Sequence, residues 1–434
     1  MNESIIDEIA LASNELDSII TVVGVGGAGG NAVNYMWNIG IRNVRFMVCN
    51  TDQQALNASP IKDKIRLGHD GLGAGDDPSK GRDAAIESLD EIRDKLEAMN
   101  TKMVFITAGM GGGTGTGAAP VIAKLAKEMD ILTVAIVTSP LLHEGEGRYV
   151  RAIAGIKELK DHVDSLLIIN NENIMNLFPD DATLEEAFGK PNEILSCAAK
   201  GIAEIITVKS NFVNVDFADV SKVMKNSGRA HLSVEAATGA KRAEIVAKQS
   251  LTSLLLDHKS ITGAKKVLFN MATSDTNKLK LREMNYILNY IQSHARYTDN
   301  AGVIHTAEVI WGSSCKPELG DNLELVLVAT GFDNDNEEFP TYDQLLLAIE
   351  DPNSPFYRMN SSSQGRDGIH NPIDTISPLA SGQAVVLAPR KPRYSNIGAL
   401  LRVPAYIARR AKMIAESDGG DGKEEIEKSE GSLF

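Results

Sequence analysis

Two glycine-rich segments have the residue types and spacing to bind phosphate. The first reads GVGGAGGN over residues 24–31, and the second reads AGMGGGTGTG over residues 108–117. Glycine amides can close around phosphate oxygens, and a helix that begins after such a loop adds the positive end of its dipole. Threonine hydroxyls in the second segment supply further donors. The sequence therefore predicts a site for a phosphorylated ligand.

The first segment alone leaves two ligands open, NAD and a nucleoside triphosphate. Gly24, Gly26 and Gly29 match the GxGxxG dinucleotide fingerprint, and Asp52 is a candidate for its ribose acid. The second segment favours the triphosphate, because a dehydrogenase needs no second phosphate loop. The sequence contains no GxxxxGK[ST], so no P-loop lysine is expected. Two loops after separate parallel strands fit a triphosphate at the carboxyl edge of a sheet.

A third segment, NVDFADV over residues 214–220, carries two carboxylates three residues apart. From the residues alone, Asp216 and Asp219 are best interpreted as a capping arrangement at a helix start, because such caps are common. Carboxylates this close repel one another unless a cation or a polarised water lies between them.

The elements that must position these segments alternate between apolar strands and amphipathic helices, which predicts a parallel sheet. The predicted strands are apolar throughout, as expected when both sheet faces are covered; they span residues 19–25, 44–48, 103–107, 131–138 and 166–169. Helices are predicted over 32–37, 79–99 and 118–129. The second of them is expected to bury Ile86, Leu89, Ile92 and Leu96.

A long amphipathic helix, predicted from Asn192 to about Val208, connects this domain to a second, smaller α/β domain. The second domain is predicted to contain helices over 219–226, 240–256 and 279–295 and strands near 265–273, 303–312 and 323–332. The last of these helices is expected to bury Leu281, Met284, Ile287, Leu288 and Ile291.

Composition limits the function classes. The 434 residues are 43% hydrophobic and 24% charged, which suffices for two globular domains. A net charge of −14 argues against nucleic-acid binding, which needs clustered Lys and Arg. Three scattered cysteines, Cys49, Cys197 and Cys315, argue against a disulfide framework and a structural zinc site. With neither a signal peptide nor an apolar run of ~18 residues, the sequence predicts a cytoplasmic protein without direct membrane insertion.

The text around the glycine loops resembles one family. GGGTGTG after an apolar strand is similar to the signature of the tubulin and FtsZ superfamily, and VVGVGGAGGNAVN, CNTDQQAL, GLGAGDDPSKGRDAA and NVDFADV resemble its FtsZ branch. The resemblance covers about residues 18–332. It implies a GTPase that uses GTP, GDP and Mg²⁺, polymerises head to tail, and acts in the cell-division ring at midcell.

The resemblance also implies roles for individual positions. Phosphate contacts are implied for Gly27, Ala28, Gly29, Gly30 and Asn31 and for Gly113, Thr114, Gly115, Thr116 and Gly117. Glu144 and Arg148 match positions near the ribose and phosphates; without the family they would be a solvated charge pair. Guanine contacts are implied for Asn171, Phe188 and Asn192, although Asn192 could equally cap the connecting helix. The family's usual Pro-Asn-Asp is Asn170-Asn171-Glu172 here.

The resemblance reverses the interpretation of the acidic pair. In the family, this segment enters the nucleotide site of the neighbouring subunit, which assigns Asp216 and Asp219 to water activation or polarisation and Asn214 to their support. Mg²⁺ is expected to be held mostly by phosphate oxygens and waters, so no metal ligand is assigned to the protein.

The C-terminal segment also resembles the family, whose linker ends in a short partner-binding peptide. Here Arg402 replaces an acidic residue and Tyr406 replaces Phe. The resemblance implies that membrane-tethering and regulatory division proteins bind Val403, Pro404, Tyr406, Ile407, Arg409 and Arg410. The acidic end either masks this peptide or only aids solubility.

The predicted fold class is α/β: a Rossmann-like parallel-sheet GTPase domain, a connector helix, a smaller α/β domain and a disordered linker and tail. The predicted boundaries are 1–17 for an N-terminal extension, 18–191 for the GTP-binding domain, 192–213 for the connector helix and 214–332 for the smaller C-terminal domain. They continue with 333–398 for the linker, 399–412 for the partner peptide and 413–434 for the acidic tail. Rival hypotheses are an NAD-dependent oxidoreductase, a filament for cell shape or plasmid partition, and a nucleotide-binding scaffold without turnover.

Overall fold

The computed structural model describes residues 18–41, 43–175, 183–208, 213, 215–251, 261–299, 302–332, 342 and 344. The predicted N-terminal extension, the partner peptide and the acidic tail lie outside these residues, as does the linker apart from Tyr342 and Gln344.

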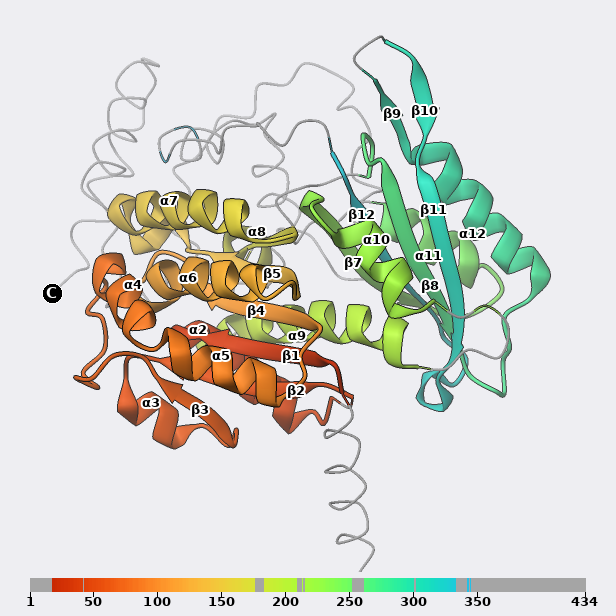
Figure 1. Cartoon of the computed structure of the whole chain (residues 1–434). Helices are drawn as coiled ribbons and strands as arrows, with labels where there is room; N and C mark the ends of the chain where they lie inside the picture. The colour runs from red at the N-terminus through yellow and green to blue at the C-terminus, as the bar shows by residue number, and fades with distance from the viewer. Residues whose placement is uncertain are drawn as a thin grey trace, which may run out of the picture. The chain divides into compact units, whose positions relative to one another are not determined.

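Strands and helices alternate along the first half of the chain (Figure 1). The strands are β1 (Ile20–Val25), β2 (Arg45–Asn50), β3 (Asp63–Arg66), β4 (Met103–Gly109), β5 (Leu132–Ser139) and β6 (Ser165–Asn170). The helices between them are α2 (Gly26–Asn38), α3 (Gln53–Ala58), α4 (Pro78–Glu87), α5 (Leu89–Ala98), α6 (Thr114–Glu128), η1 (Leu142–Glu144), α7 (Glu146–His162) and α8 (Asn171–Met175).

The second half begins with the long helix α9 (Leu184–Thr207). It continues through α10 (Phe217–Met224), β7 (Gly228–Ala237), α11 (Arg242–Ser250), β8 (Lys266–Thr273), α12 (Leu281–His294), β9 (Arg296–Thr298), β10 (Ile304–Thr306), β11 (Glu308–Cys315), η2 (Pro317–Leu319) and β12 (Leu323–Thr330).

The main sheet has the strand order β11-β8-β12-β7-β6-β5-β4-β1-β2-β3 in the described part of the chain. The run from β3 to β6 is parallel throughout, so the carboxyl ends of these strands share one edge. β7 pairs with β6 only briefly, through Ser165 with Gly228 and Leu166 with Arg229. β12 then runs antiparallel to both β7 and β8. The predicted α/β class, with a mainly parallel nucleotide-binding sheet, is confirmed.

The central strands are buried on both faces, which explains their lack of alternation. Every residue of β5 is buried, as is β4 up to Ala108. Helix α2 packs on β1 and β4 and against α9, while α6 packs on β4 and β5 and against α7. A second apolar core lies around β8, β12, α11 and α12 and includes Phe269 and Ile287. Each half of the described chain therefore contains a large apolar core.

Three details differ from the sequence predictions. The helix expected over 79–99 is two helices, because Ser88 interrupts it and accepts the Gly68 N–H at 3.1 Å. The helix therefore changes direction, and Ile86 is 51% exposed although Ile92 and Leu96 are buried. Leu281, at the first position of α12, is 71% exposed.

The third difference concerns the connecting helix and the strand that follows α10. α9 begins at Leu184, so Asn192 lies inside the helix and its predicted capping role is wrong. Pro191 also lies inside α9. β7 was not predicted at all, although it is the strand that joins the two parts of the sheet.

Candidate functional site

The first glycine loop turns directly from β1 into α2 and is closely packed. A Cβ at Gly24 would lie 2.5 Å from the Gly29 carbonyl oxygen. A Cβ at Gly29 would overlap the Thr107 carbonyl oxygen of β4. Glycine is therefore required at both positions because α2 begins against the backbone of the sheet. This packing fixes the helix N-terminus at the carboxyl edge.

The two glycine loops meet at that edge. Gly26 has a φ of 72°, and a Cβ there would lie 2.9 Å from the Gly115 amide nitrogen. By contrast, a Cβ at Gly27 or Gly30 would meet nothing within 4 Å. Gly27, Ala28 and Asn31 are exposed. The N-terminal turn of α2 is thus open above a rigid base that β4 and α6 provide, which fits an anion.

The second loop is closely packed, and most of its glycines are buried. The Thr116 hydroxyl is buried and accepts the Gly111 N–H at 2.8 Å, which closes the loop on itself. A Cβ at Gly113 would lie 2.7 Å from the Ala74 Cβ, and a Cβ at Gly117 would overlap the Pro78 carbonyl oxygen. Gly113 and Gly117 therefore have a packing reason to be glycine whatever else they contact. Thr114 is half-buried.

A charged cluster borders the second loop. The Glu144 carboxylate accepts an N–H from Arg148 at 2.6 Å and the Leu141 N–H at 2.8 Å. A guanidinium nitrogen of Arg148 lies 3.6 Å from Asp76, and one of Arg151 lies 3.7 Å from the same carboxylate. These contacts bring Glu144 and Arg148, the two residues predicted from HEGEGR, together beside the second glycine loop.

Arg151 and Asp76 belong to this site although sequence reasoning missed both. The Arg151 Nε donates to the Gly111 carbonyl oxygen at 3.0 Å, which ties α7 to the second loop. The available signal was helical spacing, because Arg151 follows Arg148 by three residues and so lies on the same face of α7. For Asp76, no comparable local pattern exists.

The end of β6 carries the predicted base-recognition residue. The side-chain oxygen of Asn171 is buried and has no hydrogen-bond partner among the described residues. A buried amide oxygen without a partner costs about 1–3 kcal/mol, so its position calls for a ligand donor. Next to it, the Glu172 carboxylate accepts the Leu142 N–H at 3.3 Å and so ties α8 to η1. This arrangement fits the N–H groups of a purine base.

The other two predicted base contacts lie on α9. Asn192 is half-buried within the helix. Phe188 lies one to two turns earlier, and its side chain is outside the described part of the structure. Helix α9 packs against both α2 and α8, which places it between the first glycine loop and the Asn171 segment.

The acidic pair forms the capping box that the sequence suggested. The Asp219 N–H donates to Asp216 at 3.0 Å, and the Asp216 N–H donates back to Asp219 at 3.1 Å. Asp216 is exposed and Asp219 is half-exposed. The preceding segment packs on β11, because Ser313 donates its N–H to the Val213 carbonyl oxygen at 3.1 Å. Asn214 lies outside the described residues.

Metal and thiol chemistry find little support in the described residues. No group of three or more His, Cys, Asp or Glu side chains there could hold a metal ion. Burial, with a smaller contribution from Glu91, raises the pKa of the Cys49 thiol to about 12, so this cysteine stays protonated and is a poor nucleophile. Within the same residues, no helix has the length and hydropathy needed to span a membrane.

Two family models match the chain. Residues 19–179 match the GTPase domain of the Tubulin/FtsZ family, and residues 228–333 match the C-terminal domain of the FtsZ family. Among similar proteins, the cell division protein FtsZ of Porphyromonas gingivalis is 38% identical over 96% of this chain and 93% of its own length. That of Buchnera aphidicola is 44% identical over 74% of this chain and 81% of its own.

Solved structures agree with the sequence comparison. An empty FtsZ dimer from M. jannaschii is 36% identical and has a TM-score of 0.65, covering 77% of this chain and 94% of that one. CetZ2 from Haloferax volcanii, solved as a GTPγS-bound protofilament, has a TM-score of 0.61 at 18% identity and shares the fold.

Proposed function

The chain belongs to the FtsZ family of tubulin-like cell-division GTPases, and we propose that it polymerises head to tail into filaments whose active sites are shared between subunits. Membership establishes that the chain binds guanine nucleotide and hydrolyses GTP. The finer proposal concerns how its residues divide that work. One subunit supplies the nucleotide-binding loops, and the next supplies the hydrolytic carboxylates.

The nucleotide is proposed to lie at the carboxyl edge of β1 and β4. The phosphates contact the loop amides from Gly27 to Asn31 and from Gly113 to Gly117, where open space above Gly27 and Gly30 supports the assignment. Arg148 and Glu144 lie beside the phosphates and ribose. The unpaired oxygen of Asn171 accepts an N–H of guanine, with Phe188 and Asn192 on α9 as the remaining base contacts.

Hydrolysis is proposed to use Asp216 and Asp219 of the adjacent subunit, with Asn214 in support. Phosphoryl transfer depends mainly on positioning and charge, so orienting a water in line with the γ-phosphate is a sufficient role. The exposure of Asp216 leaves its carboxylate accessible to a neighbour. Mg²⁺ would offset the phosphate charge, held mostly by phosphate oxygens and waters.

The filament is proposed to act at the division site at midcell. The similarity to the P. gingivalis protein extends over 96% of this chain and supports the same cellular role. Membrane-tethering and regulatory division proteins would bind the peptide with Val403, Pro404, Tyr406, Ile407, Arg409 and Arg410. That peptide lies outside the described residues, and its role rests on sequence resemblance alone.

The observation that carries the proposal is the convergence of two glycine loops on one open helix N-terminus. The test combines GTP-dependent sedimentation with phosphate release over a series of protein concentrations. Turnover per subunit should rise steeply with concentration, because isolated subunits lack half of each active site. Turnover that is constant per subunit at all concentrations would contradict the shared site.

Two variants at Asp219 separate chemistry from capping. Asp219→Asn keeps an oxygen that can accept the Asp216 N–H but removes the charge, whereas Asp219→Ala removes both. We expect both variants to bind GTP normally and to lose about 10²- to 10³-fold in turnover within filaments. Wild-type turnover in Asp219→Asn would show that only the cap matters.

A further inference from the structure

Helix α10 carries the proposed hydrolytic carboxylates at its N-terminus, and its C-terminal end is held by side chains from several strands. The last carbonyls of a helix have no partner within the helix. Here the Thr330 hydroxyl donates to the Val223 carbonyl oxygen at 2.9 Å, and the hydroxyls of Ser165 and Ser227 each donate to that of Met224 at 2.8 Å. The end of α10 is therefore fixed in place.

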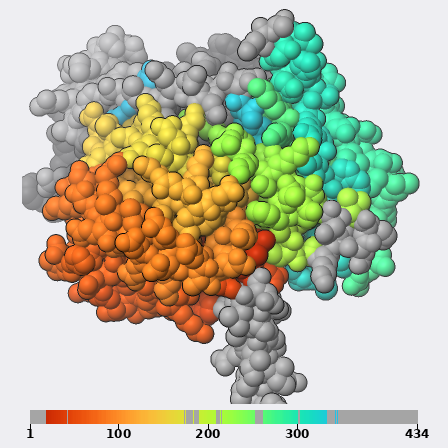
Figure 2. All heavy atoms as spheres, in the orientation of Figure 1, coloured from red at the N-terminus to blue at the C-terminus, as the bar shows by residue number. Residues whose placement is uncertain are grey.

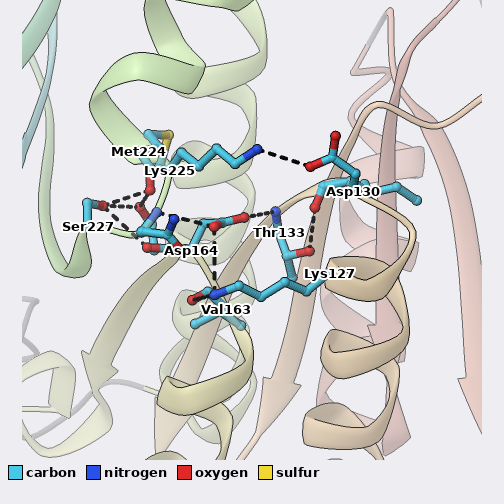
Figure 3. Close-up of polar contacts among 11 residues, drawn as sticks. Lys127, Asp130, Thr133, Val163, Asp164, Met224, Lys225 and Ser227 are labelled. Carbon is cyan, nitrogen blue, oxygen red and sulfur yellow. Dashed lines mark hydrogen bonds and ion pairs between the residues drawn. The ribbon is translucent and has the colours of Figure 1, made fainter.

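Asp164 lies at the centre of this junction and is 2% exposed (Figure 3). One carboxylate oxygen accepts the Thr133 N–H at 2.9 Å, and the other accepts the Asn226 N–H at 3.2 Å. Its own carbonyl oxygen accepts the N–H groups of Ser227 at 2.8 Å and Gly228 at 3.1 Å. A single residue thus binds three consecutive amides of the turn that follows α10.

That turn has an uncommon backbone conformation, which the contacts of Asp164 support. Asn226 has a φ of 50° and Gly228 a φ of 68°, so both lie in the left-handed region. Lys127 of α6 stands 3.8 Å from the same carboxylate and partly balances its charge. Removing the Asp164 side chain would leave the Thr133 amide without its acceptor in a buried setting and the Asn226 amide without its acceptor in a partly buried one.

The contacts of α10 fall into two groups. Those from Thr330, Lys266 and Glu308 come from β12, β8 and β11, which belong to the same domain as α10. Contacts to the nucleotide-binding domain come from the start of β6 and from Asp130, which pairs with Lys225 at 3.0 Å at the surface. Figure 2 shows green atoms from the middle of the chain against the orange and yellow atoms of the nucleotide-binding domain. The Asp164 cluster thus sets α10 relative to the nucleotide-binding domain.

We propose that Asp164 is a positioning residue for GTP hydrolysis, acting through α10 on Asp216 and Asp219. This inference rests on the proposed role of those two carboxylates. Asp164 stands just before β6, at the amino edge of the sheet, and the glycine loops follow the carboxyl ends of β1 and β4. Asp164 should therefore affect hydrolysis without affecting nucleotide binding in its own subunit.

The geometry sets the size of the effect. The eight residues of α10 span about 12 Å at ~1.5 Å per residue. A tilt of about 5° at the Met224 end would displace the carboxylates at the other end by ~1 Å, and misplacement by that distance can reduce catalysis about 10²-fold. We expect Asp164→Ala to lower turnover per polymerised subunit by roughly 10- to 100-fold.

The experiment uses the full chain with Asp164→Ala, Asp164→Asn and Ser165→Ala. The control is Asp161→Ala, which removes an exposed carboxylate three residues earlier on α7. The GTP affinity of each variant should stay within about twofold of wild type. Turnover in sedimented filaments should fall most in Asp164→Ala and less in Asp164→Asn. Ser165→Ala removes only one of the two hydroxyl groups that donate to the Met224 carbonyl oxygen, and it tests the same end of α10 if Asp164→Ala does not fold. Unchanged turnover in Asp164→Asn and Ser165→Ala would overturn the proposal.

Mixed filaments distinguish positioning from general damage. In a co-sedimenting mixture of equal parts wild type and Asp164→Ala, damage confined to α10 leaves about half of the interfaces active, whereas damage to both halves of the site leaves about a quarter. We expect half. A quarter, or a loss of GTP affinity in Asp164→Ala, would refute the positioning role.

Filaments of Asp219→Ala test separately the premise that Asp216 and Asp219 act in hydrolysis. If these filaments turn over GTP like wild type, the proposed function fails. If Asp219→Ala is inactive but Asp164→Ala is not, only this inference fails.

Discussion

Two glycines of the first loop, Gly27 and Gly29, should respond in opposite ways to alanine. A Cβ at Gly29 would overlap the Thr107 carbonyl oxygen, which belongs to the backbone of β4 and cannot rotate away. Forcing such a contact costs about 3 kcal/mol, at the upper end of the range for overpacking. In a domain of this size, that loss lowers Tm by roughly 6–12 °C.

Gly27→Ala should instead leave the fold intact. Its Cβ would meet nothing within 4 Å, and alanine is the better helix former by up to about 1 kcal/mol. The methyl group would occupy space where the phosphates are proposed to bind, so GTP affinity should fall about tenfold or more, which is ~1.4 kcal/mol. The unchanged or raised Tm of the nucleotide-free protein would show that the loss is local.

Thermal unfolding of nucleotide-free protein and equilibrium GTP titration measure the two effects independently. Wild-type GTP affinity in Gly27→Ala would refute the assignment of open space to the phosphates. A wild-type Tm in Gly29→Ala would refute the packing account of the loop. If the Gly29→Ala variant folds and still binds GTP, that result would agree with the packing account, because Gly29 is buried.

Two further predictions concern charged groups outside the site. Lys316 is 5% exposed and pairs with both Glu204 of α9 and Glu324 of β12, so Lys316→Met should lower the free energy of unfolding by about 3–5 kcal/mol. Lys200 is half-exposed and is another partner of Glu204, so Lys200→Met should cost less than about 1 kcal/mol. Equal urea midpoints for the two variants would contradict this account. Burial raises the pKa of Glu235 from 4.5 to about 7, so the stability that its protonated form contributes is present below pH 4.5 and is lost as pH rises through about 7. Glu235→Gln should remove that loss in urea titrations, and the same pH dependence in wild type and variant would refute it.

Much of the nucleotide-binding domain could be predicted because its signals are local. The strands β1, β4 and β5 appear as short apolar runs, and each glycine loop lies between a strand and a helix. The capping box at Asp216 and Asp219 was equally visible, because it depends on two side chains three residues apart. The structure confirms the box, while the hydrolytic role of the pair remains a prediction.

Errors arose where contacts distant in sequence decide local structure. Ile86 fits a helical stripe in the sequence. In the structure the Ser88 hydroxyl accepts the Gly68 N–H, the helix ends there, and Ile86 is exposed. β7 has the polar residues Arg229, His231 and Ser233, and these mask its strand character. It is a strand because β12 pairs with it from Ala230 to Ala237.

The sequence by itself predicted two segments for phosphate binding and favoured a triphosphate over a dinucleotide as their ligand. These properties follow from residue type and spacing, which fix backbone freedom and helix starts over a few residues. Only the tertiary structure decided that Gly26 and Gly115 lie at one edge, because β1 and β4 are neighbours in the sheet although far apart in the chain. It also decided that Asp164 holds the turn after α10, across about 60 residues of sequence. Such contacts depend on how the whole chain packs, and no local pattern encodes them.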